Sequence, residues 1–338
     1  MPHVAVLGPS GGVVGLQTSV CLLEAGYKVT IVAQHLPGDS SIEYTSPWAG
    51  ADFRAQAPEG DLEWRDWEMQ TYNEWMDTIH KEKTDRTLTK SGLRRIRDNK
   101  PTESFYWAPH VQSFATMTPF EPPISDINTH APPNSPQIYT GASFTSIALN
   151  TPYYLLNLLS QARNLGATVI QTRIPVEGRL PGALTFVERL VTKHNRPSID
   201  VYVNATGLGA AKLCNDEAMF PIRGQTVLVK GEAEAIRARS GNEYGAYCIP
   251  RPGSGTTILG GTREAGVWSE KVDDNTTKKI LERCSPFAPE LLTGQDGGFE
   301  VISAQVGLRP GRKGGPRMEV ENVDGKPVVH AYGHAGAG

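Results

Sequence analysis

The sequence has few cysteines, no long apolar run and little net charge, and each shortage excludes a class of protein. The four cysteines form no Cys-x-x-Cys pair and have no metal-ligand spacing with histidine, so we expect reduced thiols and no metal site. A bridge between Cys248 and Cys284 stays open as the alternative. No run of about 18 apolar residues is present, so we expect no membrane span. A net charge of −3 gives no reason to expect nucleic acid or an anionic membrane as a partner.

The N-terminus also lacks a basic region followed by an apolar one, so no secretory signal is expected. What the chain does have is size: 338 residues, of which 39% are apolar, suffice for a large core. This length favours two domains. We therefore expect a soluble intracellular protein, whose oligomeric state the sequence does not indicate.

The first forty residues predict one β–α–β unit. An apolar strand, Val4 to Leu7, runs into a glycine-rich turn, and apolar residues then recur at helical spacing from Val13 to Glu24. Gly26 is expected to end the helix, because glycine accepts the left-handed conformation found there. Val29 to Ala33 follows as a second buried strand. This order of elements is the context that a dinucleotide-binding turn requires.

The turn itself, "GPSGGVVG", has unusual glycine spacing. The Gly-x-Gly-x-x-Gly pattern fails, because Ser10 stands where the first glycine would precede Gly12 and Gly15. We interpret the segment as the usual turn lengthened by two residues, with Gly8 or Gly11 making the tight bend; a plain glycine-rich turn is the alternative. Gly12 would let the backbone approach phosphate, and Gly15 would let the helix pack closely on the strand. The residues expected to hold pyrophosphate are Gly8, Ser10, Gly11, Gly12, Val13, Val14 and Gly15.

The end of the second strand carries Gln34 and His35, where nicotinamide-dependent enzymes usually place an acidic residue for the ribose hydroxyls. Both side chains can bind a sugar, but neither carries a negative charge at neutral pH. The pattern argues against a freely exchanging NAD. A nicotinamide dehydrogenase and a flavin-carrying protein without turnover stay as the competing interpretations.

Seven blocks spread along the chain have the sequence of one known family, in the same order. They are "EYTSPWAGAD" (43–52), "VNATGLGA" (203–210), "PIRGQTVLV" (221–229), "AYCIPRPG" (246–253), "LGGTREAGVW" (259–268), "VGLRPGRKGGPR" (306–317) and "VVHAYGHAGAG" (328–338). Together they resemble the D-amino-acid oxidase family of FAD enzymes, which includes D-aspartate oxidase. The resemblance implies a mixed α/β fold with a Rossmann-type FAD-binding domain and a discontinuous antiparallel-sheet substrate domain. The expected boundaries are 1–50, 141–210 and 301–338 for the first domain, and 51–140 and 211–300 for the second.

The resemblance also implies non-covalent FAD and the residues that hold it. Small residues and one indole at 48–52 would line the flavin, those at 205–209 would close over the pyrophosphate, and Ile174 would pack on the adenine. Besides the glycine turn, the expected cofactor residues are Gln34, His35, Glu43, Trp48, Ala49, Gly50, Asp52, Ile174, Ala205, Gly207, Arg309, Gly333, Gly336 and Gly338.

The substrate implied by the resemblance is a D-amino acid. Its α-carboxylate needs a fixed bidentate cation, which arginine offers and lysine does not. Arg309 matches the family residue for this task, Tyr247 matches the tyrosine that meets the same carboxylate, and the carbonyl around Gly336 would receive the amine. No side chain need act as general base. Dioxygen would reoxidise the flavin, giving hydrogen peroxide, and the imino acid would hydrolyse to a 2-oxo acid and ammonia.

Two arginines suggest an acidic substrate, so that D-aspartate is the favoured partner and broad specificity the alternative. Arg263 follows "LGGT" where broad D-amino-acid oxidases more often carry an uncharged residue, and it would pair the second carboxylate. Arg239, in an expected lid, is a second candidate for that carboxylate. Arg97 is a third candidate for the pocket, although the charged segment 94–100 is expected to be a solvated loop.

Three tryptophans, Trp64, Trp67 and Trp75, recur at helical spacing and are expected to face the core rather than a cofactor. The family's sequences continue beyond the last block with an aromatic and amide-bearing segment, a helix and often a peroxisomal tripeptide. We therefore interpret the chain as cut short at Gly338. The resemblance implies a peroxisomal location, for which no signal is visible.

Overall fold

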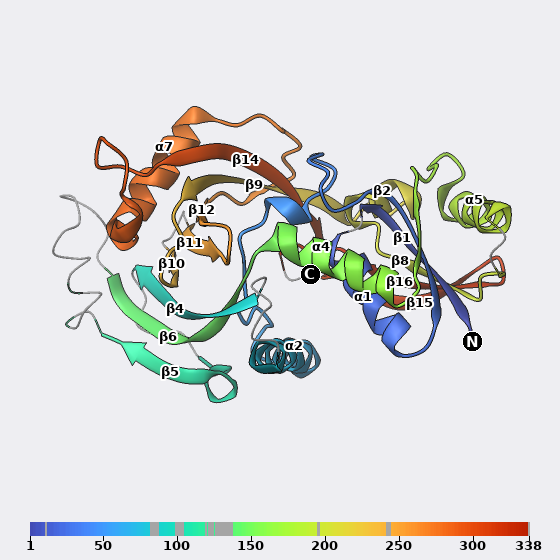
Figure 1. Ribbon diagram of the computed structural model, residues 1–338, viewed down its shortest axis with the longest axis horizontal. Coiled ribbons are helices and arrows are strands. Elements are labelled where there is room, and N and C mark those ends of the chain that lie inside the picture. Colours follow the sequence, from blue (N-terminus) through green and yellow to red (C-terminus); the bar gives the residue numbers. More distant parts are fainter. Residues whose placement is uncertain are drawn as a thin grey trace.

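The protein is built on two β-sheets, which lie at opposite ends of an elongated molecule (Figure 1). The computed structural model describes residues 1–10, 12–81, 88–98, 105–118, 120, 125, 138–194, 197–240 and 245–336. Among these residues, one sheet has six strands and the other has ten. This mixed α/β architecture is the predicted fold class.

The six-stranded sheet has the strand order β15-β16-β8-β1-β2-β7. Its neighbouring strands pair in parallel, except for the β15–β16 hairpin at one edge. The strands are β1 (His3–Ser10), β2 (Lys28–His35), β7 (Thr168–Gln171), β8 (Val201–Asn204), β15 (Arg317–Val323) and β16 (Lys326–Tyr332). A parallel sheet is buried on both faces, which explains the apolar runs in β1 and β2.

Helices cover both faces of this sheet. In β1, Val4 and Val6 face one side, where α1 (Val13–Glu24) and α4 (Thr151–Asn164) pack, whereas Ala5 and Leu7 face α5 (Arg179–Lys193). Gly26 and Gly166 follow α1 and α4 with φ of 86° and 96°, a conformation that glycine adopts without strain. The predicted β–α–β unit and its helix bounds are confirmed.

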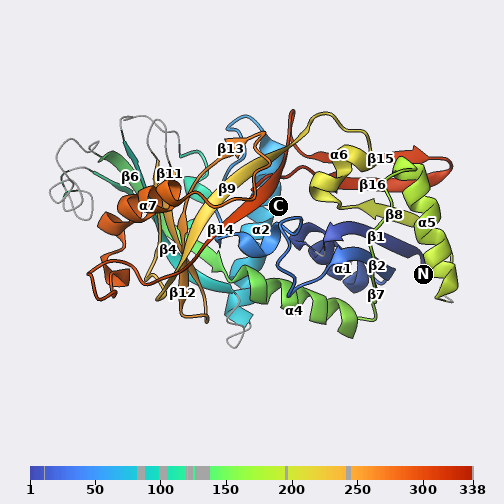
Figure 2. The same ribbon diagram turned by 90° about the horizontal axis from the view of Figure 1, so that it is seen from above.

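The ten-stranded sheet is mostly antiparallel and has the order β13-β9-β12-β11-β10-β4-β6-β3, with β14 paired to β9 and β5 to β6. The long β9–β14 pair extends from this sheet towards the six-stranded one (Figure 2). One face is covered by α7 (Asp274–Cys284). The strands are β3 (Ala51–Asp52), β4 (Leu88–Asp98), β5 (Gln112–Met117), β6 (Ile138–Leu149), β9 (Met219–Lys230), β10 (Ile236–Ser240), β11 (Gly245–Arg251), β12 (Thr256–Gly260), β13 (Glu264–Ala265) and β14 (Val301–Arg312).

Short helices complete the described chain. They are η1 (Ser46–Trp48), η2 (Ala108–His110), η3 (Gly207–Gly209), α6 (Ala210–Leu213), η4 (Ser285–Phe287) and η5 (Pro289–Leu291). No helix among the described residues is long and apolar enough to cross a membrane.

The tryptophan stripe of α2 (Leu62–Lys81) does not form its core face, so that prediction was wrong. Met69, Tyr72 and Met76 are the residues of α2 that pack in the core, and at 3.6 residues per turn they lie on another face of the helix. Trp67 is 45% exposed. Of the stripe, Trp75 packs against the core, with its ring edge-on to Tyr154 at 6.5 Å.

Residues 94–98 were also expected to lie in a loop, and instead they belong to β4. Their backbone pairs with β6 on one side and β10 on the other. Strand pairing uses backbone groups, so a charged segment can form a strand when its neighbours supply the partners.

The two thiols Cys248 and Cys284 are buried in the cluster beneath α7, and all four cysteines are free. The expectation of reduced thiols is confirmed and the alternative bridge is not formed.

The domain boundaries expected at 141 and 301 fall in or at the start of β6 and β14, two strands of the ten-stranded sheet. We propose a cofactor domain built on the six-stranded sheet and a substrate domain built on the other.

Two neighbouring leucines of α4 test the core. Leu155 is 1% exposed and Leu156 is 46% exposed. We expect Leu155→Ala to lower the free energy of unfolding by about 2–5 kcal/mol, because it empties a packed site. Leu156→Ala, the matched control with the same change in helix propensity, should change it by less than about 0.5 kcal/mol. Urea denaturation of the two variants measures both values, and equal losses would contradict the described packing.

Candidate active site

A large cavity lies where the two sheets meet. Its volume of about 1930 Å³ exceeds the roughly 300–1,000 Å³ of an ordinary small-molecule pocket. The cavity therefore has room for a dinucleotide together with a substrate. Sequence-predicted residues that line it are Gly12, Val13, Val14, Gly15, Gln34, Glu43, Trp48, Ala49, Gly50, Asp52, Ile174, Ala205, Gly207, Tyr247, Arg263, Arg309, Gly333 and Gly336.

Three predicted residues, Gly8, His35 and Arg239, do not line the cavity. Gly8 is not in the turn, because β1 continues to Ser10 and pairs Gly8 with Ala33. His35 stacks on Tyr44 instead of lining the cavity, with the ring centroids 6.4 Å apart. Gly11, Gly338 and the side chains of Ser10 and Arg97 lie outside the described residues.

Arg239 is not in a lid, because it belongs to β10 between β4 and β11. It pairs with Ala246, whose side chain lies in the cluster under α7. Successive side chains of a strand alternate between faces, so Arg239 faces away from Tyr247 and the cavity. The structure therefore does not bring Arg239 to the predicted site.

The cofactor end of the cavity begins at the N-terminus of α1. Gly12 caps this helix without a side-chain hydrogen bond, and the first turn carries no acidic residue. The Val13 N–H donates to Ser46 Oγ at 3.3 Å, whereas the N–H groups of Val14 and Gly15 have no hydrogen-bond partner among the described residues. These groups and the helix dipole at this end favour a phosphate. A Cβ atom on Gly15 would lie 3.6 Å from the Cβ of Ala205 and 3.7 Å from Val6, so α1 packs closely here. The roles expected of Gly12 and Gly15 fit this geometry.

A carboxylate stands beside the end of β2, although the strand itself offers none. The Glu43 side chain accepts a hydrogen bond from Gln34 Nε2 at 3.1 Å and lies 3.4 Å from His35 Nε2. Gln34 and Glu43 both line the cavity. The loop after β2 thus supplies the negative group that could receive ribose hydroxyls.

The backbone of the loop at 46–50 is hydrogen-bonded by Arg251, a residue that was not predicted from the sequence. Arg251, 8% exposed, donates from Nη2 to the carbonyls of Pro47 at 2.8 Å and Ala49 at 3.2 Å. Burial lowers the pKa of Arg251 to about 10. Thr151 Oγ1 donates to the same Ala49 carbonyl at 3.0 Å. These bonds fix a loop whose side chains line the cavity.

Two glycines leave space for the side chains of Arg309 and Tyr247, the residues predicted to bind the substrate. A Cβ atom on Gly224 would overlap the Arg309 guanidinium, and one on Gly260 would overlap the Tyr247 ring. Arg309 is half-buried, and with the described part of the chain its guanidinium makes one hydrogen bond, from Nη1 to the Thr262 carbonyl at 3.4 Å. Most of its donors are therefore available to a ligand.

Burial raises the pKa of Tyr247, although the charges of Arg309 and Arg54 oppose the shift. The phenol therefore stays protonated at neutral pH and can donate a hydrogen bond. Arg263 lies at the cavity rim, is exposed, and makes no hydrogen bond or ion pair with the described residues.

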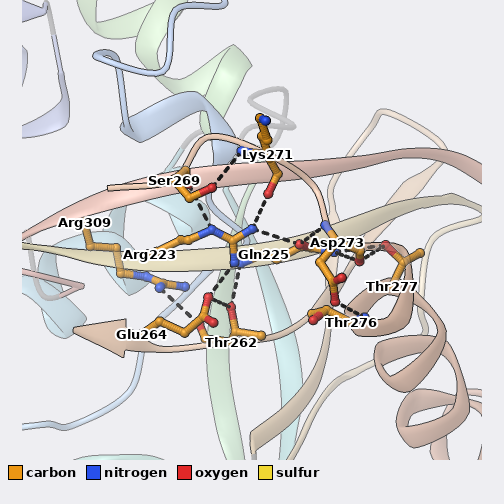
Figure 3. Close-up of polar contacts among 10 residues, drawn as sticks. All are labelled: Arg223, Gln225, Thr262, Glu264, Ser269, Lys271, Asp273, Thr276, Thr277 and Arg309. Carbon is orange, nitrogen blue, oxygen red and sulfur yellow. Dashed lines mark hydrogen bonds and ion pairs between the residues drawn. The ribbon is translucent and has the colours of Figure 1, made fainter. Parts of the chain in front are cut away.

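A buried polar network behind the cavity was also missed by the sequence analysis (Figure 3). Arg223, 4% exposed, donates to the carbonyls of Ser269 and Lys271 and to the Glu264 carboxylate. Gln225 receives a further bond from Arg223 and holds the backbone of Asp273 through both ends of its amide. The "PIRGQ" block held the signal: two polar residues flank a glycine in an otherwise apolar strand.

A parallel sheet whose first helix begins at a large cavity, with a second sheet that brings an arginine and a tyrosine to the same cavity, is the arrangement of a dinucleotide-binding enzyme. The family described as FAD dependent oxidoreductase, DAO, matches residues 3–338, and the chain belongs to this family. FAD is accordingly its cofactor, and the helix terminus, the carboxylate and the cavity volume fit that group.

Relatives and solved structures agree with this family. A D-amino-acid oxidase of Fusarium vanettenii is 34% identical over 346 residues, covering 99% of this chain and 92% of that protein. A D-aspartate oxidase of Cryptococcus neoformans var. grubii is 32% identical over 384 residues, with the same coverage and a lower score. Glycine oxidase from Bacillus cereus has the same fold, with a TM-score of 0.68 at 19% identity, covering 99% of this chain and 90% of that one.

Replacing Glu43 tests the cofactor end. We expect Glu43→Gln to weaken FAD binding about tenfold, or about 1.4 kcal/mol, because a neutral amide accepts hydroxyl hydrogen bonds less strongly than a carboxylate. Titration of the apoprotein with FAD, followed by flavin fluorescence, measures the dissociation constant. Glu24→Gln, an exposed residue at the end of α1, is the control. Equal affinities in both variants would exclude Glu43 from the cofactor site.

Proposed function

We propose that the protein oxidises D-amino acids with FAD and dioxygen, giving 2-oxo acids, ammonia and hydrogen peroxide. The observation that carries the proposal is Arg309, a half-buried guanidinium that faces the cavity and makes one hydrogen bond with the residues that the structure describes. A partly buried cation without an acidic partner is stabilised when an anion binds beside it in the cavity. The family and the D-amino-acid oxidase among its relatives support an amino-acid α-carboxylate as that anion.

When bound, FAD would supply the two-electron redox chemistry of the reaction, with dioxygen as the final electron acceptor. The residues that we propose to hold it are those of the cofactor end: Gly12, Val13, Val14, Gly15, Gln34, Glu43, Trp48, Ala49, Gly50, Ile174, Ala205, Gly207, Gly333 and Gly336. The protein's own contribution is to bind, orient and exclude water.

We propose that Arg309 binds the α-carboxylate through two parallel hydrogen bonds and that the protonated Tyr247 hydroxyl donates to the same group. The backbone carbonyl around Gly336, at the same cavity, receives the amine. These contacts fix two substituents of Cα, the carboxylate and the amine. The hydrogen on Cα must also face the cofactor, and this third requirement leaves one enantiomer able to react. No side chain is required as a general base.

The proposed substrate range is that of a D-amino-acid oxidase. The relative with this name matches with a higher score than the D-aspartate oxidase. Arg239 faces away from the cavity, and Arg263 is exposed at its rim, where water screens the charge.

A preference for D-aspartate is the second candidate, because Arg263 still lines the cavity. It requires that wild type prefers D-aspartate to D-alanine in kcat/KM and that Arg263→Tyr removes this preference. A peroxisomal location stays a prediction.

The visible spectrum of the purified protein tests the proposed activity directly. We expect the absorption of oxidised flavin, which bleaches when a D-amino acid is added without oxygen and stays when the L-form is added. A protein that shows flavin absorption but no bleaching would be a passive carrier. A colourless protein that binds NADH would overturn the proposal.

Exchange of Arg309 tests the carboxylate site. We expect Arg309→Lys to keep FAD bound and to lower kcat/KM by roughly 30- to several-thousand-fold, because loss of a desolvated charge pair costs about 2–5 kcal/mol. Steady-state oxygen consumption with D-alanine measures the loss, and flavin absorbance checks the loading. Arg189→Lys, an exposed arginine of α5, is the control. Full activity in Arg309→Lys would assign this arginine another task.

A further inference from the structure

Asp52 and Arg54 lie on the cavity side of the chain that follows η1. Phe53, between them, points into the core, where it is 6% exposed and its ring lies 4.8 Å from that of Tyr72. Alternation in an extended segment therefore places Asp52 and Arg54 together on the opposite side. Both line the same cavity as Arg309 and Tyr247.

The two side chains form a bidentate ion pair. Arg54 donates from Nε and Nη2 to the two carboxylate oxygens of Asp52, the second bond being 3.1 Å long. The Asp52 side chain is 7% exposed and that of Arg54 is 26% exposed. Burial strengthens such a pair relative to one at the surface.

The pair lies against the substrate-binding tyrosine. The Arg54 guanidinium carbon is 5.8 Å from the centroid of the Tyr247 ring. The charge of Arg309 also lies close enough to Tyr247 to lower the pKa of its hydroxyl. The cavity thus presents two interior arginines around Tyr247, of which Arg309 has no acidic partner among the described residues and Arg54 has one.

This difference decides what each arginine can bind. A substrate has one α-carboxylate, and Arg309 can pair with it. A second carboxylate that approached Arg54 would meet a cation already neutralised and would lie close to the negative charge of Asp52. A neutral side chain avoids that repulsion, and one with an oxygen can accept a hydrogen bond from the Arg54 N–H groups that Asp52 does not use.

We propose that Asp52 masks the charge of Arg54 and thereby excludes acidic D-amino acids, which makes the Asp52–Arg54 pair the specificity-determining element of the substrate pocket. The proposal rests on the function proposed above. It assigns the pocket to neutral D-amino acids, with polar uncharged side chains accommodated at Arg54. Removing the charge of Asp52 would turn Arg54 into a second carboxylate-binding cation.

Asp52→Asn tests this directly, because asparagine keeps the size of the side chain and loses its charge. We expect the ratio of kcat/KM for D-aspartate to that for D-alanine to rise at least tenfold. The double variant Asp52→Asn with Arg54→Gln should return the ratio to within about threefold of wild type, because the unmasked cation is gone. Asp77→Asn, an exposed aspartate at the cavity edge, is the control and should leave the ratio unchanged.

Asp52→Ser removes the same charge with a smaller side chain. It controls for any effect that comes from the asparagine amide rather than from the loss of charge. An unchanged ratio in Asp52→Asn and Asp52→Ser, with flavin bound, would overturn the proposal, as would a wild type that already prefers D-aspartate. Loss of flavin from both variants would also overturn it, since Asp52 would then serve the cofactor. If wild type oxidises no D-amino acid, the proposed function itself fails, whereas an active wild type with unchanged ratios in the variants refutes the masking alone.

Discussion

The hydrogen bonds of the buried Arg223 guanidinium determine the position of the cavity rim. It lies on β9 and bonds three groups of the segment 264–271, a stretch with little regular structure. A buried charge without partners would be costly, so these bonds make one position of the segment far more favourable than others. Gln225 extends the hold to Asp273, which caps α7 by accepting a hydrogen bond from Thr276. The cavity rim is thereby tied to the sheet and to α7.

The same short piece of β9 serves the cavity on its other face. Arg223 and Gln225 point towards the segment and α7, so Gly224 between them faces the opposite side, where the Arg309 guanidinium lies. Arg309 reaches this place because β14 pairs with β9 in a register that sets Gly307 opposite Gly224. One three-residue sequence therefore fixes the cavity rim on one face of the sheet and leaves space for the Arg309 guanidinium on the other.

Much of this arrangement could be predicted from the sequence, and the rest depends on long-range pairing. The apolar period and Gly26 fix both ends of α1, and family blocks place Arg309 and Tyr247 at one cavity. The direction of Arg239 could not be predicted, since it follows from which strands flank β10. The core face of α2 was missed for a similar reason: helical spacing marks several apolar stripes, and only the neighbouring sheet decides which one is buried.

Three cavity arginines, Arg54, Arg263 and Arg309, differ in burial and in whether an acidic side chain neutralises them. These two properties decide which ligand each arginine can bind. Arg263 is exposed, so water screens its charge and it selects weakly between ligands. Arg54 is partly buried but neutralised by Asp52. Arg309 alone among these three combines partial burial with the lack of an acidic partner in the described chain. Within the described chain, Arg309 is thus the partly buried cavity arginine that lacks an acidic partner, and this supports the proposed ligand with one carboxylate, an amino acid with an uncharged side chain.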